Sequence, residues 1–137
     1  MFAIDPAFEA TSLAVGELAL SHVRLQDDAR FVWLILIPRL EAAAELEDVE
    51  AAKRVLLMEE VVWAGRAVRQ ICTEAGRPID KLNVASLGNV TRQLHIHIVG
   101  RWRDDPLWPA PVWGAPGASP LADPDGLLGR ARAALGL

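Results

Sequence analysis

Two histidines separated by a single residue stand in the most strand-like segment of the chain. The segment reads RQLHIHIVGRWR over residues 92–103, and it contains His95 and His97. The chain has only 3 histidines among its 137 residues, so this pairing needs a chemical explanation. Imidazole is a good nucleophile and hydrogen-bonding group near neutral pH, so a pair of imidazoles can bind a phosphate or attack it.

A β-strand over residues 92–101 would place both histidines on one face, because side chains alternate between the two faces of a strand. The apolar face, which must pack on the core, then holds Leu94, Ile96 and Ile98. The opposite face holds Gln93, His95, His97 and, if the strand continues past the glycine at 100, Arg101 and Arg103. Imidazole and guanidinium groups both donate hydrogen bonds to phosphate oxygens, so this polar face predicts an anion site.

The composition describes an ordinary globular chain, with 52% hydrophobic and 23% charged residues and a net charge of −4. Its length favours a single domain over residues 1–137. The charge gives no general attraction to nucleic acid or to an anionic membrane, and the longest apolar run, residues 31–38, is too short to cross a bilayer. The lone Cys72 excludes an intramolecular disulfide and a cysteine zinc cluster. With no signal peptide at the start, we expect a cytoplasmic protein.

The order of strand-like and helical segments predicts an α+β fold. Asp5 followed by Pro6 is typical of the start of a helix, here a short one. We expect strands over 17–26, 30–39, 81–87 and 92–101, and a long helix over about 48–75. The predicted buried face of that helix consists of residues that recur at steps of three and four: Val55, Met58, Val62, Gly65, Val68, Ile71 or Cys72, and Ala75. Together these segments predict an antiparallel sheet of about five strands with one long helix packed on it.

The tail after residue 104 differs from the rest of the chain. It carries most of the prolines together with Trp108 and Trp113, so we expect an irregular segment and then a short helix over 125–135. The two tail tryptophans could cover a core of their own, cap a ligand site or reach a partner subunit. Four other side chains have structural interpretations: Trp33 and Trp63 in the core, Glu60 on a solvated helix face, and His22 on the surface of the first hairpin.

The stretch LGNVTRQLHIHIV resembles the signature of the histidine-triad (HIT) nucleotide hydrolases and transferases. That signature is His-x-His-x-His preceded by a glycine, and here Gly88 stands five residues before Gln93, the first triad position. Asn83 lies about where the family often has a ribose-contacting Asn. The strand WLILIPR and the Trp/Pro-rich stretch DDPLWPAPVWG are also similar to the family. The resemblance covers about residues 2–115, leaves a tail over 116–137, and implies a HIT-like fold and a homodimer.

The resemblance also implies a mechanism and a set of site residues. His95 would attack the α-phosphorus of a dinucleoside polyphosphate or nucleoside phosphoramidate, and water would then hydrolyse the nucleotidyl-His95 intermediate. His97 would bond the non-bridging oxygens or hold the tautomer of the nucleophile. The residues expected to bind the nucleotide and its phosphate are Asn83, Gly88, Asn89 and, from the face described above, Arg101. The family mechanism requires no metal and no cofactor.

Gln93 departs from the triad, because an amide can bond a phosphate oxygen but carries no titrating proton. A positioned acid commonly accelerates a reaction by about 10²–10⁴, so hydrolysis could be slow or limited to good leaving groups. Val90 stands where many relatives have Ser or Thr, and Thr91 is expected to point to the opposite face.

Three functions therefore stay open. The first is the nucleotide hydrolase or transferase described above. The second is a nucleotide-binding protein with weak or no catalysis, in which Gln93 marks the lost step. The third is a metal-bound sensor or structural dimer, since His-x-His on a strand is a good ligand geometry but needs further ligands.

Overall fold

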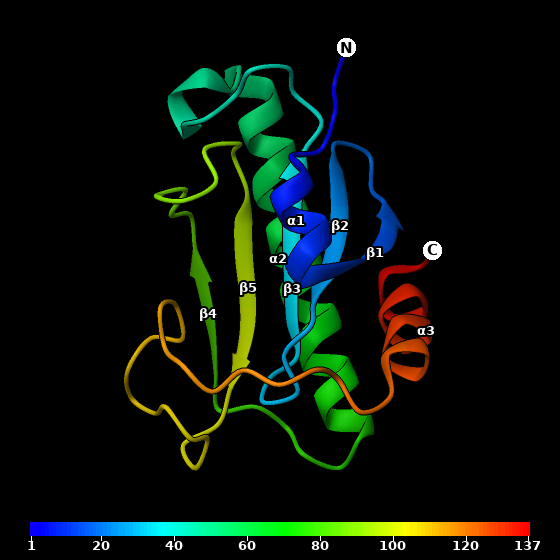
Figure 1. Ribbon diagram of the computed structural model, residues 1–137. Coiled ribbons are helices and arrows are strands. Elements are labelled where there is room, and N and C mark those ends of the chain that lie inside the picture. Colours follow the sequence, from blue (N-terminus) through cyan, green and yellow to red (C-terminus); the bar gives the residue numbers. More distant parts are fainter.

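A computed structural model describes residues 1–137 and shows an α+β arrangement of three α-helices and five strands (Figure 1). In chain order the elements are α1 (Pro6–Thr11), β1 (Ser12–Glu17), β2 (Ser21–Gln26), β3 (Trp33–Pro38), a short 3-10 helix (Leu46–Asp48), α2 (Ala51–Glu74), β4 (Lys81–Ala85), β5 (Ile96–Arg101) and α3 (Pro124–Leu135). The predicted N-terminal helix, long helix and C-terminal helix are confirmed. The Asp5 side chain caps α1 by accepting a hydrogen bond from the Ala7 N–H at 2.9 Å.

The five strands form one antiparallel sheet in the order β1-β2-β3-β5-β4. Helix α2 lies behind this sheet in Figure 1, and α1 lies in front of it. The tail after β5 crosses the front of the sheet at the end where β5 finishes, before it reaches α3 beside β1. The sheet therefore has a layer on each side, and the front layer is the thinner one. None of the helices combines the length and apolar character needed to span a membrane.

Each central strand serves two separate cores, one on each face of the sheet. Alternate residues of β3 and β5 pack toward α2 in the larger core: Leu34, Leu36, Ile96 and Ile98. Their neighbours form a smaller core on the other face, together with α1 and the tail: Trp33, Ile35, Ile37, Val99, Phe8 and Val112. The predicted apolar face of β5 is thus confirmed. Because both faces are packed, side chains on the thin front layer can surround a cavity without exposing the main core.

The buried face of α2 was predicted correctly only in its second half. The residues that pack on the sheet are Leu57, Val61, Ala64, Val68 and Ile71, and each is at most 8% exposed. Val55, Met58 and Val62, which were predicted to be buried, are 66%, 60% and 42% exposed. The first half of the helix carries apolar residues on two faces, so periodicity alone cannot select the face that meets the sheet.

Three further interpretations were wrong. Glu60 is buried, and its Oε1 accepts a hydrogen bond from the Leu20 N–H at 2.6 Å, which ties α2 to the β1–β2 turn. Trp63 is 48% exposed and donates to the carbonyl of Leu135 at 3.1 Å. His22 is buried on β2, with its Nδ1 at 2.5 Å from Glu17. Strand β1 was not predicted at all, because its one apolar stretch, Leu13–Val15, is short and is followed at once by Gly16 and Glu17.

Candidate functional site

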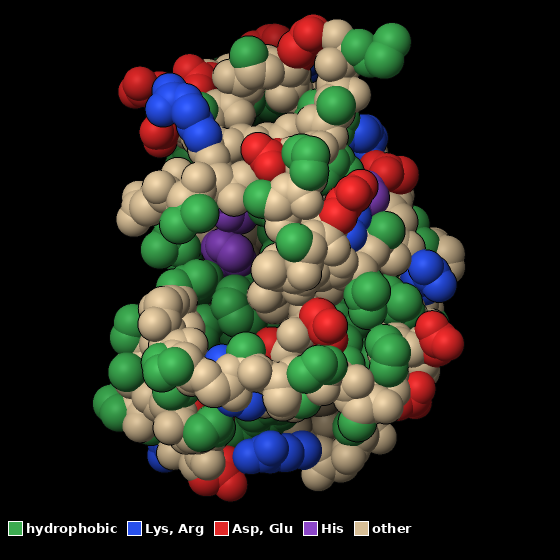
Figure 2. All heavy atoms as spheres, viewed as in Figure 1, with side chains coloured by type: hydrophobic (Ala, Val, Ile, Leu, Met, Phe, Trp, Pro, Cys, Tyr) green, Lys and Arg blue, Asp and Glu red, His purple; other side chains and the backbone are tan.

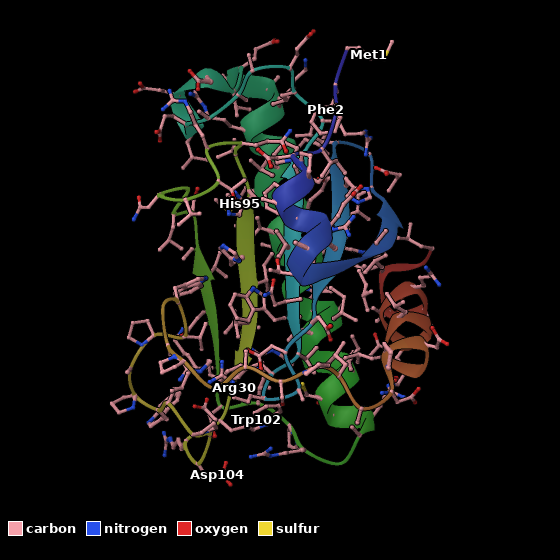
Figure 3. All side chains as sticks on the ribbon, viewed as in Figure 1. Met1, Phe2, Arg30, His95, Trp102 and Asp104 are labelled. Carbon is pink, nitrogen blue, oxygen red and sulfur yellow. The ribbon has the colours of Figure 1, made fainter.

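Two adjoining cavities open on the front face of the sheet, and the paired histidines line both. The cavity beside α1 has a volume of about 440 Å³, and the cavity beside the β4–β5 loop has a volume of about 420 Å³. Histidine side chains are visible in a recess of this face (Figure 2), and His95 lies next to α1 at the start of β5 (Figure 3). Cavities of this size take nucleotide-sized ligands.

One ring nitrogen of His95 forms a hydrogen bond with the backbone. Its Nδ1 lies 2.6 Å from the carbonyl oxygen of Gln93. A carbonyl oxygen only accepts hydrogen bonds, so Nδ1 carries the hydrogen and the Nε2 of the neutral ring is unprotonated. The rings of Phe8 of α1 and of His97 pack edge-on against the His95 ring, and the centroid of each lies 4.8 Å from the His95 centroid. This environment presents a bare Nε2, the atom a nucleophile needs.

His97 is held in the opposite tautomer. The indole N–H of Trp33 donates to Nδ1 of His97 at 3.0 Å. Since an indole nitrogen can only donate, Nδ1 is the acceptor and Nε2 carries the hydrogen. Burial, and to a lesser extent the neighbouring His95, lowers the pKa of His97 to about 4, so the ring is neutral near pH 7. His97 therefore offers a hydrogen-bond donor beside the bare nitrogen of His95.

The loop between β4 and β5 brings polar groups to the histidines. Gly88 adopts a φ of +77°, and the bend it makes puts Gly88, Asn89 and Thr91 on the wall of the second cavity. The prediction that Thr91 points away was wrong: residues 86–95 form bends instead of a strand, so the two-residue alternation does not apply to them. A threonine next to the Gly-Asn bend was the signal in the sequence for this wall.

Gln93 lies outside both cavities, so the prediction that its amide contacts the phosphate is wrong. Its Oε1 accepts a hydrogen bond from the Asp5 N–H, and its Nε2 donates to the carbonyl of Ala3, both at 2.8 Å. The side chain thus holds the N-terminal segment that leads into α1, while its own carbonyl holds His95. The prediction failed because strand alternation was assumed through residue 93, whereas β5 begins at Ile96.

Asn83 and Arg101 are also absent from the walls of both cavities, which corrects their predicted roles. Arg101 is 1% exposed and forms an ion pair with Asp105 at 2.8 Å. The same guanidinium donates to Oδ1 of Asn83 at 2.8 Å and to the carbonyl of Ala110 at 2.9 Å. Arg101 shares a face with the histidines, as expected, but it lies at the far end of β5 and binds the chain itself.

Most of the remaining wall residues were not singled out as site residues from the sequence; Trp113, for which a place at a ligand site was one of three alternatives, is the exception. Trp33 was expected only in the core, yet it both lines the first cavity and holds His97. Trp113 of the tail lines both cavities, with its ring centroid 5.5 Å from that of His97, and Trp108 instead lies 5.7 Å from the Arg101 guanidinium. Asp28, which follows β2, also lines the first cavity. Its partner Arg30 lies toward the opposite end of the sheet from His95 (Figure 3).

No group of three or more His, Cys, Asp or Glu side chains lies close enough together to hold a metal ion. The walls of the second cavity offer a nucleophilic nitrogen, a neutral donor, a hydroxyl at Thr91 and an amide at Asn89. This set can displace a leaving group from a phosphorus atom and bond the oxygens around it.

The five-stranded sheet and the largely buried imidazole pair on its cavity walls define an α+β protein of the histidine-triad type. The sequence matches the HIT domain over residues 7–104, which is more than half of the chain. The chain belongs to the HIT domain family, and the predicted family and fold are confirmed. Proteins of this family generally bind or hydrolyse nucleotides, and they commonly form dimers.

Solved structures of three bacterial histidine triad proteins match almost the whole chain. The protein from Bradyrhizobium japonicum is 33% identical, with a TM-score of 0.87 and 98% of each chain covered. The protein from Marinobacter aquaeolei is 30% identical, with a TM-score of 0.88 and coverage of 99% of this chain and 97% of the other. The protein from Sinorhizobium meliloti is 30% identical, with a TM-score of 0.87 and coverage of 97% and 96%. No curated protein matches the chain significantly.

Proposed function

We propose that the protein is a nucleotide hydrolase or transferase that cleaves at the α-phosphate through a nucleotidyl-His95 intermediate. Its substrate class is a dinucleoside polyphosphate or a nucleoside phosphoramidate. One observation carries this proposal: at the cavities, Nδ1 of His95 lies 2.6 Å from the Gln93 carbonyl oxygen, so in the neutral ring Nε2 is the nitrogen with the free lone pair. Membership of the HIT family supports it, because these proteins generally bind or hydrolyse nucleotides.

The reaction runs in two displacements. The lone pair on Nε2 of His95 attacks the α-phosphorus, and the bond from phosphorus to the leaving group breaks, so the leaving group departs with that electron pair. The ring then bears a positive charge, which the Gln93 carbonyl stabilises through the Nδ1 hydrogen. Water attacks the same phosphorus, the P–N bond breaks, and the nucleoside monophosphate and one proton are released while His95 returns to its starting form.

The surrounding groups take supporting roles in this proposal. The Nε2–H of His97 bonds a non-bridging phosphate oxygen, and the amide of Asn89 with the backbone at Gly88 bonds others. The nucleoside lies in the first cavity against Phe8 and Ile35. Gln26 lines the same cavity and makes no side-chain hydrogen bond within the chain, so its amide is available to the base or ribose.

A nucleotide-binding protein with little turnover is the second candidate. The favouring observation is that the Gln93 amide is bonded to the backbone at Ala3 and Asp5 and has no contact with the cavities. In that case AMP would raise the melting temperature of the protein without any substrate being consumed.

The test is to trap the covalent intermediate. The protein is incubated with diadenosine polyphosphate or adenosine 5′-phosphoramidate, quenched without acid because P–N bonds are acid-labile, digested and examined by mass spectrometry. We expect an added AMP on the peptide that contains His95, and no adduct and no product from His95→Asn. His22→Asn is the matched control, since His22 is the one histidine outside both cavities, and it should still form the adduct.

Product without any adduct, or an adduct on another residue, would contradict the proposed mechanism. Stabilisation by AMP with neither adduct nor product would favour the binding protein. Loss of activity or of fold in the presence of a chelator would favour the metal-dependent alternative.

We also propose that the protein is a homodimer that pairs through α2 and the edge of the sheet at β4. Strand β4 lies at the edge of the sheet, and both α2 and β4 carry exposed apolar side chains: Val55, Met58, Val62 and Val84 are 66%, 60%, 42% and 49% exposed. A further cavity of about 260 Å³ is lined by residues of α2 and β4, Met58 and Val84 among them, and most of its lining residues are apolar. A second copy is the occupant that fits, because HIT proteins commonly dimerise and an unpaired edge strand can extend its sheet across a two-fold axis.

A further inference from the structure

We infer that the site contains no group able to give a proton to the leaving group, so that its substrates are nucleotidyl compounds whose leaving group departs as a stable anion. Phosphates, polyphosphates and carboxylates belong to this class, whereas amines and alcohols do not. This inference rests on the proposed function and narrows it, since it removes phosphoramidates from the good substrates.

The argument begins with Trp33, which prevents His97 from acting as an acid. A histidine gives up a proton readily only from its doubly protonated form, in which both ring nitrogens carry hydrogen. The Trp33 N–H points at Nδ1 of His97 at 3.0 Å, so a proton on Nδ1 would meet another hydrogen. A neutral His97 that lost its Nε2 hydrogen would become an imidazolate, which is far too basic to form here. His97 can therefore donate a hydrogen bond but cannot transfer the proton.

The first triad position offers no substitute. Gln93 is an amide and does not titrate, and its side chain holds the backbone at Ala3 and Asp5 away from both cavities. The two motif positions on either side of His95 thus lack an acid for different reasons. Gln93 cannot titrate, and His97 is prevented from acting as an acid by Trp33.

The remaining polar groups of the cavities do not supply a proton either. The only other ionisable side chains on the walls are Asp28 and Arg30, and they are paired: both carboxylate oxygens of Asp28 accept hydrogen bonds from Arg30, at 3.0 and 2.8 Å. Both oxygens of Asp28 are thus occupied as hydrogen-bond acceptors, and neither is turned toward a leaving group as a donor. Thr11 and Thr91 have hydroxyls that do not ionise in the neutral range. The hydrogen on Nδ1 of His95 is held by the Gln93 carbonyl and points away from Nε2, where the phosphorus binds.

The consequence for the first displacement follows from charge balance. When the P–X bond breaks, atom X keeps the bonding electrons and leaves as an anion unless it receives a proton. An amide or alkoxide anion is too basic to leave unaided, whereas a phosphate or carboxylate is already stable as an anion at neutral pH. The strength of the leaving group therefore replaces the missing acid in this site.

The inference is tested with aryl esters of AMP that differ only in the leaving phenol, from nitrophenyl to unsubstituted phenyl. We expect kcat/KM to fall by about 10² or more from the first ester to the second, which is the scale of the missing acid catalysis. Adenosine 5′-phosphoramidate should be cleaved more slowly still than the phenyl ester, because an amide anion is far more basic than phenoxide. Similar rates for both esters, within about tenfold, would overturn the inference and leave the proposed function intact.

Trp33→Phe provides the decisive variant because it keeps a ring in place and removes the N–H. Nδ1 of His97 is then free to take a proton, so the ratio of phenyl to nitrophenyl cleavage should rise by about tenfold or more as the pH is lowered toward 6. Trp63→Phe is the matched control, because Trp63 lies on α2 with its N–H on the Leu135 carbonyl, remote from His97, and should leave the ratio unchanged. A ratio that stays constant in Trp33→Phe would overturn the role of the indole.

A spectroscopic readout keeps the inference testable even if no ester is cleaved, an outcome that would by itself count against the proposed function. Nitrogen-15 NMR distinguishes the two neutral tautomers of histidine from the charged ring. We expect His97 to be neutral and protonated on Nε2 at pH 6–8, and Trp33→Phe to show a mixture of forms. A wild-type His97 that carries hydrogen on Nδ1, alone or as the charged ring, would overturn the inference.

Discussion

At the scale of single residues, the two histidines adopt opposite tautomers, and in each case one neighbouring atom determines the tautomer. His95 faces a carbonyl oxygen and His97 faces an indole N–H, so one presents a bare Nε2 and the other a protonated one. The alternation of residues along a strand places such side chains on one face, but it says nothing about their tautomers. A nucleophile beside a neutral donor therefore arises from neighbours that are distant in the sequence.

Gly88 gives a prediction at this scale. Its φ of +77° is costly for any residue with a Cβ, so Gly88→Ala should destabilise the fold by about 1–2 kcal/mol. The strained bend should also displace Asn89 and Thr91, which line the cavity, and weaken AMP binding by about tenfold or more. Urea unfolding measures the first effect and isothermal titration calorimetry the second.

Gly76→Ala is the control for that variant, because Gly76 has a φ of +78°, nothing within 4 Å of a built Cβ, and a position after the end of α2. It should cause a similar loss of stability with no change in AMP affinity. If the two variants reduced AMP affinity equally, the bend at Gly88 would have no specific part in binding.

At the scale of elements, α1 is attached to the site by one side chain. Gln93 holds the backbone at Ala3 and Asp5, Asp5 caps α1, and α1 carries Phe8 against the ring of His95. The amide at the first triad position is thus a positioning group for the helix that walls the first cavity. Its substitution should act through the order of α1.

Gln93→Glu tests this connection. The carboxylate keeps the shape of the amide but places an oxygen, in place of the Nε2 donor, against the carbonyl oxygen of Ala3. We therefore expect the free energy of unfolding to fall by about 1–3 kcal/mol. Hydrogen exchange of the α1 amides should accelerate, and the effect should be confined to residues near 3–11. Glu41→Gln, which breaks only the exposed pair with the N-terminal ammonium group, should leave that exchange unchanged. Equal exchange in both variants would show that Gln93 does not hold α1.

The elements themselves were largely predictable, and their packing was less so. Asp5-Pro6 identified α1, because these residues impose local backbone geometry at the start of a helix, and the predicted long helix over about 48–75 matches α2 closely. The buried face of α2 was misassigned between Val55 and Val62, where two apolar faces compete and only the sheet decides. Roles for Arg101 and Asn83 were wrong for a related reason, since Asp105 and Ala110 of the tail reach back to Arg101.

At the scale of the whole molecule, His97 makes stability depend on pH. Its pKa is about 4 in the folded state and near 6.5 when unfolded, so the unfolded chain binds a proton first as the pH falls. The stability from this group is complete above pH 6.5 and is lost between pH 6.5 and 4, by about 3 kcal/mol in total. Asp105, whose pKa is also lowered, acts only near and below 3.8 and so lies outside this window.

Urea unfolding at steps between pH 7 and 4.5 measures that loss. In His97→Gln the decline across this range should be clearly smaller, because glutamine does not titrate. An equal decline in both proteins would assign the pH dependence to other groups.

The proposed dimer is a second property of the whole molecule. Met58→Asp places a charge at the centre of the exposed apolar surface between α2 and β4, so it should convert a dimer into a monomer. Size-exclusion chromatography with light scattering measures the mass. Gln70→Asp, an exposed change toward the other end of the same helix, should remain a dimer. A wild-type protein that is monomeric at high concentration would contradict the proposed interface.

The buried pair of Arg101 and Asp105 has a wider consequence for how ligand preference can change. Through the Ala110 carbonyl it fastens the tail that carries Trp113 and Gly114 to the cavities, and these two residues lie beyond residue 104, where the match to the HIT domain stops. The HIT domain therefore supplies the nucleophilic nitrogen, while the C-terminal tail supplies part of the wall that surrounds the ligand. Exchanging the tail between relatives while retaining Arg101 should change ligand specificity. The chemical step at His95 should stay the same.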